Sequence, residues 1–135
     1  MRYLAVLVFC FFLVSQQAHA CLGLFAETTL FFKTIPSPPP DADVIARVSL
    51  LNVNDDGAIA EVMQVIKATG AKVQQGDVIA LSFRVSSCGP SHKSGNEGII
   101  IAKAGADSAG RFVFYPYIYR DNDGKFWPPS VRTQQ

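Results

Sequence analysis

The chain has 135 residues, with twelve Lys or Arg and eleven Asp or Glu, and its formal net charge is +1. This near-neutral balance argues against a nucleic-acid binder, because such a protein needs a basic patch that neutralises phosphates. The chain also lacks the polybasic run that anionic lipid headgroups attract. We therefore expect no nucleic acid among its partners.

The amino-terminal residues 1–20 have the pattern of a cleavable signal peptide. Arg2 supplies a positive charge, Leu4–Val14 is an unbroken apolar run, and Ala18–Ala20 reads as an A-x-A cleavage site. The apolar run is shorter than the ~20 residues that span a bilayer. We expect an exported protein, secreted or periplasmic, that begins at Cys21 and has no membrane span after cleavage. Removing 20 of the 135 residues leaves 115, enough for one compact domain.

Export determines how the cysteines are interpreted. Of three cysteines, Cys10 leaves with the signal peptide, whereas Cys21 and Cys88 remain. In an oxidising compartment an even pair is most simply a disulfide. The alternative is a bacterial lipoprotein that carries its lipid on Cys21. His19 fits that processing poorly, and Cys88 would then have no partner.

Residues 21–41 form an amino-terminal segment and a proline-rich connector. Cys21–Lys33 is apolar and irregular, and the prolines of Ile35–Pro40 restrict φ and remove backbone donors. We interpret the proline-rich tract as a stiff spacer, with a ligand for an aromatic-lined groove as the alternative. Residues 42–135 form the domain and its carboxyl-terminal tail.

The domain begins with a predicted β-hairpin. Val44–Val53 is rich in β-branched and aliphatic residues, Asn54–Gly57 is a strong turn signal, and Ala58–Ala68 returns as the second strand. A helix over residues 58–67 is the alternative, although the turn before it favours a strand. The apolar residues that also match helical spacing are Ile59, Val62, Met63 and Ile66.

Three further strands are predicted. Val78–Ser86 alternates between polar and apolar residues, which places one face in a core. Ile99–Lys103 is a short buried strand, and Arg111–Arg120 is the last strand, with Pro116 marking an edge or a bulge. Phe126–Pro129 is expected to pack back as a lid. Five strands within about 80 residues predict an all-β fold of the size of a small Greek-key barrel, with a short helix as an optional addition.

Few residues suggest a catalytic site. His92 is the one histidine of the expected mature chain, and it follows Cys88 by four positions. A catalytic Cys–His pair comes together across a fold with a third orienting group, and a zinc site needs three or four ligands. Asp121 and Asp123 precede Gly124 as in a calcium loop, but the later ligands are absent. We therefore expect a protein that is not an enzyme, with no cofactor and no metal site.

Four features occur in an informative order. Cys21 stands first after the signal peptide, and residues 42–48 read Ala-Asp-Val-Ile-Ala-Arg-Val. Residues 61–70 form a strand that ends in Lys and Gly, and residues 86–101 are a Cys-Gly loop that leads into three isoleucines. This order resembles the netrin-like domain, and within it the inhibitory domain of the tissue inhibitors of metalloproteinases, over residues 21–119.

The resemblance implies a five-stranded OB barrel and a mechanism of inhibition. In that family the first cysteine chelates the catalytic zinc of a protease through its α-amine and its carbonyl oxygen. By analogy Cys21 is the chelating residue, Leu22 enters the pocket beside the zinc, and Gly23 contacts the protease. The spacing of Cys21 and Cys88 is close to that of the family's first disulfide. The implied partner is a zinc metalloprotease.

The chain also differs from those inhibitors. They begin Cys-x-Cys, whereas this chain has Cys21-Leu22-Gly23, and it lacks their other first-domain disulfides and their second domain. Many netrin-like modules do not inhibit proteases. Two functions therefore stand side by side. One is a secreted metalloprotease inhibitor. The other is a non-inhibitory envelope or extracellular binding module, with lipid anchoring at Cys21 as one form of it.

The cysteine pair gives a first prediction. If Cys21 and Cys88 form a disulfide, both thiols of the exported protein resist alkylation until a reductant is added. Cys88→Ser should then lower the free energy of unfolding by about 2–5 kcal/mol, because the unfolded chain loses a cross-link. Mass spectrometry of alkylated protein and denaturant unfolding measure the two effects. Two free thiols in freshly exported protein would contradict the prediction.

Overall fold

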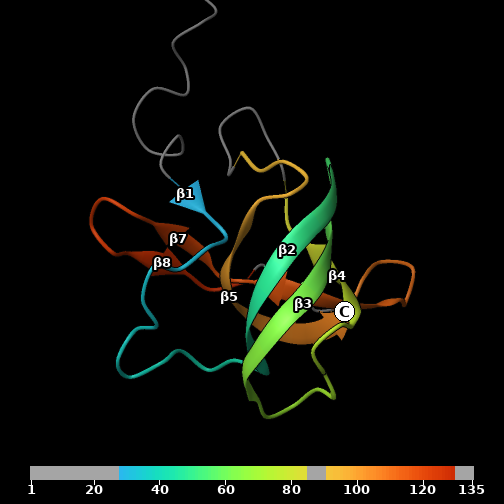
Figure 1. The fold of residues 1–135 in the computed structure, drawn as a ribbon, viewed down its shortest axis with the longest axis horizontal. Helices are drawn as coiled ribbons and strands as arrows, with labels where there is room; N and C mark the ends of the chain where they lie inside the picture. Colours follow the sequence, from blue (N-terminus) through green and yellow to red (C-terminus); the bar gives the residue numbers. More distant parts are fainter. Residues whose placement is uncertain (1–27, 85–90, 130–135) are drawn as a thin grey trace, which may run out of the picture.

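The computed structural model describes residues 28–84 and 91–129 (Figure 1). Cys21, Leu22, Gly23 and Cys88, and the expected signal peptide, lie outside the described residues. Within the described ranges the chain is all-β, and the optional short helix is not found there. The strands are β1 Thr28–Thr29, β2 Val44–Asn54, β3 Gly57–Ala68, β4 Val78–Ser82, β5 Glu97–Ala106, β6 Phe112–Pro116, β7 Ile118–Arg120 and β8 Phe126–Trp127.

Five of these strands close into a barrel in the order β2-β3-β4-β6-β5, with β5 returning to β2. All neighbours are antiparallel except β4 and β6, which pair in parallel at Leu81 and Phe114. A last strand that reaches back across the sheet to pair with the third is Greek-key connectivity. The prediction of an all-β, OB-fold-like five-stranded barrel is confirmed.

A small second sheet has the order β1-β7-β8 and lies beside the barrel (Figure 1). Its existence corrects the prediction of one strand over residues 111–120. The strand ends at Pro116, and Ile118 begins β7 in the other sheet. Proline has no amide to donate, so the ladder stops there. The Tyr117 amide still donates to the Ile101 carbonyl oxygen of β5 at 2.8 Å. The chain therefore stays bonded to the barrel where it passes from β6 to β7.

The other predicted strands differ mainly at their ends. The strand predicted over residues 78–86 ends at Ser82, although the inward alternation continues through buried Phe83. The strand predicted over residues 99–103 extends over residues 97–106. Phe126–Pro129 does pack back, with Phe126 and Trp127 forming β8 against β7. The alternation identified the buried faces correctly, whereas pairing partners determined where each strand ends.

The barrel core explains why β2 and β3 bury alternate residues. Val44, Ala46, Val48 and Leu50 of β2 face inward, and all are at most 1% exposed. Leu30, Ile100 and Phe114 fill the same core from elsewhere in the chain. Small alanines stand opposite larger residues, as the narrow interior of a small barrel requires. The inward residues of β3 are Ala58, Ala60 and Val62.

Three extra residues interrupt the β2–β3 ladder. The register skips Leu51 on β2 and skips Met63 and Ile66 on β3, so each is a bulge residue without a cross-strand partner. All three are apolar yet 39–44% exposed. A bulge resets the alternation, so the inward positions Val62 and Val65 are three residues apart. The helix alternative over residues 58–67 is wrong: of the apolar residues at helical spacing, Val62 faces the core, whereas Met63 and Ile66 are bulge residues.

The hairpin turn is built as its sequence predicts. The Asn54 side-chain oxygen accepts a hydrogen bond from the Asp56 amide at 3.0 Å. Gly57 follows with φ of 148°, and a side chain there would collide with the Leu81 carbonyl oxygen of β4. Glycine therefore lets the hairpin lie directly against the third strand.

The bulges give a prediction with a matched control. Val62→Ala removes buried side chain and should lower the free energy of unfolding by roughly 2 kcal/mol. Met63→Ala changes the adjacent exposed bulge residue and should change it by less than about 0.5 kcal/mol. Urea unfolding of both variants measures the difference. Equal losses would mean that the register around Met63 is wrong.

Candidate functional site

The amino-terminal strap, defined as Thr28–Lys33, fastens the chain entering the domain to the barrel. Thr28 and Thr29 pair with β7 as an edge strand. Leu30 is fully buried in the barrel core. The Phe32 amide donates to the Ile99 carbonyl oxygen at 2.8 Å. The strap is thus held on both sides, by the small sheet and by the first residues of β5.

His92 joins the strap to the loop before β5. The Leu30 amide donates to His92 Nε2 at 3.1 Å, and the Thr29 hydroxyl oxygen lies 3.5 Å from the same nitrogen. A backbone N–H can only donate, so Nε2 carries a lone pair and the ring proton is on Nδ1. Burial lowers the pKa of His92 below its ordinary 6.5, while a hydrogen bond with Asn96 opposes this shift. The ring is therefore neutral at neutral pH.

The Phe31 side chain packs over this joint. Its ring meets the His92 ring edge-on with centroids 4.8 Å apart. On its other side lies Gly98, where a β-carbon would collide with the Phe31 ring. A glycine at the start of β5 therefore lets the strap lie close against the barrel.

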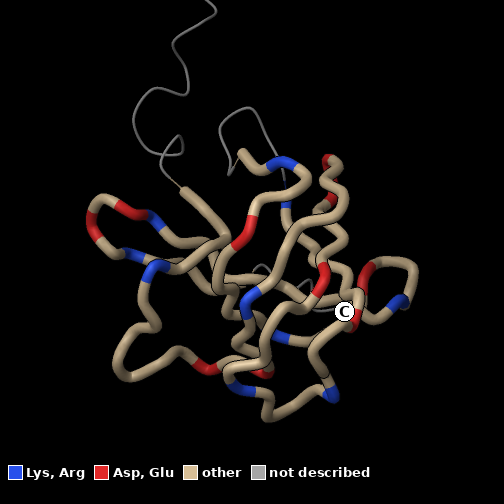
Figure 2. The backbone as a smooth tube through the Cα atoms, in the orientation of Figure 1, with Lys and Arg blue, Asp and Glu red and all other residues tan. Residues whose placement is uncertain are grey.

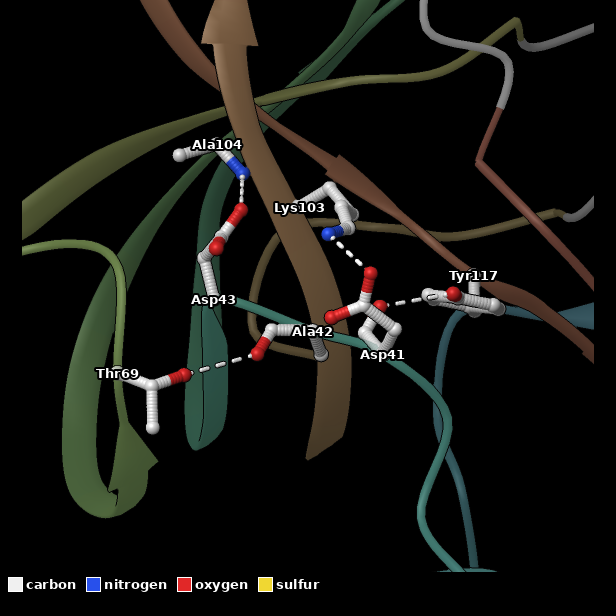
Figure 3. Close-up of polar contacts among 7 residues, drawn as sticks. All are labelled: Asp41, Ala42, Asp43, Thr69, Lys103, Ala104 and Tyr117. Carbon is white, nitrogen blue, oxygen red and sulfur yellow. Dashed lines mark hydrogen bonds and ion pairs between the residues drawn. The ribbon is translucent and has the colours of Figure 1, made fainter.

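A polar corner holds the connector where it enters β2 (Figure 3). The Asp43 carboxylate accepts a hydrogen bond from the Ala104 amide of β5 at 2.8 Å. The Asp43 carbonyl oxygen accepts from the Thr69 amide at 2.9 Å, and the Thr69 hydroxyl donates to the Ala42 carbonyl oxygen at 3.1 Å. Asp43 thereby links the start of β2 to β5 and to the end of β3.

Asp41 and Tyr117 complete the corner (Figure 3). The Tyr117 hydroxyl donates to the Asp41 carbonyl oxygen at 2.9 Å, and Lys103 Nζ lies 2.6 Å from the Asp41 carboxylate. The hydrogen bond with Asp41 raises the pKa of Lys103. The proline-rich connector is therefore anchored at its carboxyl end to β5 and to the residue between β6 and β7.

A groove of about 740 Å³ lies elsewhere on the barrel. It runs between the β2–β3 turn, the end of β4 and the loop that joins β5 to β6. Phe112 is 64% exposed there and stacks edge-on against Phe114, with ring centroids 5.1 Å apart. Arg111 at its rim is paired with the Asp107 carboxylate at 2.7 Å. The groove combines apolar walls with a charged rim.

The acidic turn between β7 and β8 binds its own chain. Acidic and basic residues lie next to each other there (Figure 2). The Asp123 carboxylate accepts hydrogen bonds from Arg120 Nε at 3.0 Å and from the Lys125 amide at 3.1 Å. The Arg120 bond lowers the pKa of Asp123 to about 2. Asp121 pairs with Lys33 of the strap. Within residues 28–84 and 91–129, no group of three or more His, Cys, Asp or Glu could hold a metal ion.

The proposed inhibitory residues Cys21, Leu22 and Gly23, and the proposed disulfide partner Cys88, cannot be located in the described residues. The segments that follow these cysteines along the chain are described. The strap follows Cys21, the His92 loop follows Cys88, and the two meet in the Leu30–His92 hydrogen bond. From the sequence, His92 fits neither a catalytic pair nor a zinc site, and no role for it is predicted. Sixty-two positions separate the partners, and no local pattern marks such a contact.

Comparison of this chain with models of known protein families, with curated protein sequences and with solved structures finds no match. Among the described residues, no helix is long and apolar enough to cross a membrane. The candidate site therefore has to be judged from its own geometry. It consists of the strap, the His92 loop and the polar corner, with the groove as a separate surface.

The polar corner gives a prediction. Asp43→Ala leaves the partly buried Ala104 amide without its partner and should lower the free energy of unfolding by about 1.5–3 kcal/mol. Asp41→Ala is the control, because it removes one side of an exposed ion pair and keeps the carbonyl that Tyr117 binds. Its cost should be at most about 1 kcal/mol. Thermal unfolding at pH 7 ranks the two, and the reverse order would contradict the assignment.

Proposed function

We propose that this chain is an exported netrin-like protein that inhibits a zinc metalloendopeptidase through its amino-terminal residue, Cys21. The OB-fold-like barrel is the scaffold that this proposal needs. The proposal makes the protein a binding partner of the protease and assigns it no reaction of its own. Its support comes from the strap and from the resemblance of the motifs in residues 21–119.

The observation that carries the proposal is the hydrogen bond between Leu30 and His92. It fastens together the two segments that follow the two cysteines. Cys21 precedes Thr28 by seven positions (28 − 21), and Cys88 precedes His92 by four (92 − 88). At ~3.5 Å per residue these lengths reach about 25 and 14 Å, so a disulfide is compatible with the barrel. A disulfide there would limit the motion of the amino terminus.

The inhibitory chemistry needs only the terminal residue. A free α-amine has a pKa near ~8, so a fraction of it carries a lone pair at neutral pH. A catalytic zinc keeps one coordination position for water or substrate and can expand to five ligands, so the amine and the carbonyl oxygen of Cys21 would complete a five-coordinate site. A rigid terminus loses little conformational freedom on binding, which favours affinity. Leu22 then supplies an apolar side chain for the adjacent pocket.

A non-inhibitory binding module is the second candidate, and the groove favours it. OB-fold barrels bind ligands on the face of their second and third strands, between the first hairpin and the loop joining the last two strands. The groove lies at that position, with Ile59 of β3 and Phe112 beside the β5–β6 loop both exposed to it. Figure 1 shows the β5–β6 loop on the side of the barrel away from the small sheet. The two candidate surfaces can therefore be altered separately.

The inhibitor proposal predicts a loss of inhibition when one alanine is added before Cys21. The extension moves the α-amine away from Cys21 and puts bulk where the zinc would sit. Leu22→Gly should weaken inhibition by about 10–200-fold and change the ranking of target proteases, since the pocket loses its side chain. A panel of purified zinc endopeptidases measures inhibition constants for the mature wild type and both variants.

Phe112→Ala is the control, because it changes the groove and leaves the strap intact. It should inhibit as well as the wild type. If the mature wild type inhibits no protease at micromolar concentration, the inhibitor proposal is wrong and the groove becomes the stronger candidate. If the extended protein inhibits as well as the wild type, chelation by Cys21 is wrong although inhibition is real.

A further inference from the structure

One hydrogen bond between the strap and the loop before β5 has a ring nitrogen as its acceptor, and this nitrogen can take up a proton. His92 Nε2 is the acceptor for the Leu30 amide at 3.1 Å. Once protonated, an imidazole has two N–H donors and no acceptor. The Leu30 amide would then point at an N–H group, and two donors would face each other in a partly buried site. The bond cannot survive protonation in this geometry.

Among the described residues, a hydrogen bond with Asn96 is what favours a positive charge on His92, and burial opposes that charge more strongly. From the strap, the ring meets the Thr29 hydroxyl and the Phe31 ring, neither of them charged. From its own loop it meets Asn96, whose side chain also accepts from the Lys93 amide. The nearest charged residues along the described chain are Lys93 and Glu97, both exposed, and neither contributes to the pKa shift of His92. No described carboxylate stabilises an imidazolium there.

The strap is also held by the packing of Leu30 and Phe32 in the core and by the Lys33–Asp121 ion pair, whereas its backbone pairing is sparse. Thr28 and Thr29 pair with β7 over two residues at the edge of the small sheet. Phe32 makes an isolated bridge to Ile99 rather than part of a ladder. The Thr29 hydroxyl oxygen accepts from the Phe31 amide within the strap itself, and this bond would remain after release. The Leu30–His92 bond joins the strap to the loop directly, and its acceptor is a group that can take up a proton.

We infer that His92 is a pH-sensitive latch: the neutral ring holds the strap through the Leu30 amide, and uptake of one solvent proton at Nε2 removes this bond and makes local opening of the strap more frequent. The barrel strands pair without His92, so protonation removes no hydrogen bond of the barrel ladders. The latch sets the position of the chain between the amino terminus and the domain, whichever partner that terminus has. It therefore stands apart from the inhibitor proposal.

The direction of the effect follows from the two states. Burial lowers the pKa of His92 in the latched state, whereas the ring of a released strap has its ordinary value of 6.5. The released state therefore binds more protons than the latched state. The free energy that favours the latched state falls as pH drops below 6.5, and it stops falling once the latched ring is itself protonated. Between pH 7.5 and pH 5 the opening constant should rise by at most about 30-fold, the ratio set by a group with pKa ~6.5.

The test uses the mature chain and amide hydrogen exchange followed by NMR, with rates corrected for the intrinsic effect of pH. The protection factor of the Leu30 amide should fall by 5- to 30-fold from pH 7.5 to pH 5. The Val62 amide of β3, which donates to the Asp77 carbonyl oxygen just before β4, is the internal reference and should keep its protection. The His92 ring resonances should titrate over the same pH range as the loss.

Two variants complete the test. His92→Gln supplies an acceptor that does not titrate, so its Leu30 protection should not depend on pH. His92→Arg supplies only donors and a permanent charge, so its Leu30 protection at pH 7.5 should be as low as that of the wild type at pH 5. The inference is overturned if the wild-type Leu30 protection is the same at both pH values. It is also overturned if His92→Gln loses protection with acid as the wild type does.

Discussion

The pairing of β2 with β3 is the constraint on which the rest of the structure depends. This hairpin contributes the longest strands of the barrel, and β4 and β5 pair with its two outer edges. A five-stranded sheet closes only if its strands coil strongly, and bulges supply that coil. Leu51, Met63 and Ile66 are the extra residues that do so. Their exposed apolar side chains follow from bending the hairpin, since a bulge residue leaves the inward and outward alternation.

Barrel closure brings β5 beside β2, and this places the features of the candidate site. Asp43 at the start of β2 can reach the Ala104 amide only because those strands are neighbours. The strap crosses the first residues of β5 at Gly98, next to the loop that carries His92. Both ends of the described amino-terminal segment are thus attached to the barrel, at the strap and at the polar corner. A barrel that holds this segment can present the residues before it to a partner.

The two candidate surfaces are held by different contacts of the barrel. The strap and the loop with His92 share the hydrogen bond from the Leu30 amide to His92 Nε2, and a proton on that nitrogen removes it. The groove is lined mainly by the β2–β3 turn, β4 and the β5–β6 loop, with Ile118 of β7 and Pro128 also in its wall. Loss of strap contacts should therefore leave in place the parts of the groove wall that belong to the barrel. This separation lets function at the amino terminus be distinguished from binding at the groove.

The sequence alone determined the strand faces and the β2–β3 turn, because alternation and turn chemistry are local properties. The OB-fold-like class came from the order of motifs that resembles the netrin-like domain. Only the tertiary structure decided that residues 111–120 divide between two sheets at Tyr117, since that depends on which carbonyl the Tyr117 amide can reach. It also decided the helix-or-strand question at residues 58–67, where the bulge residues Met63 and Ile66 also match helical spacing. The role of His92 had no local signal, because its partner Leu30 lies 62 positions away and a backbone amide carries no sequence signature.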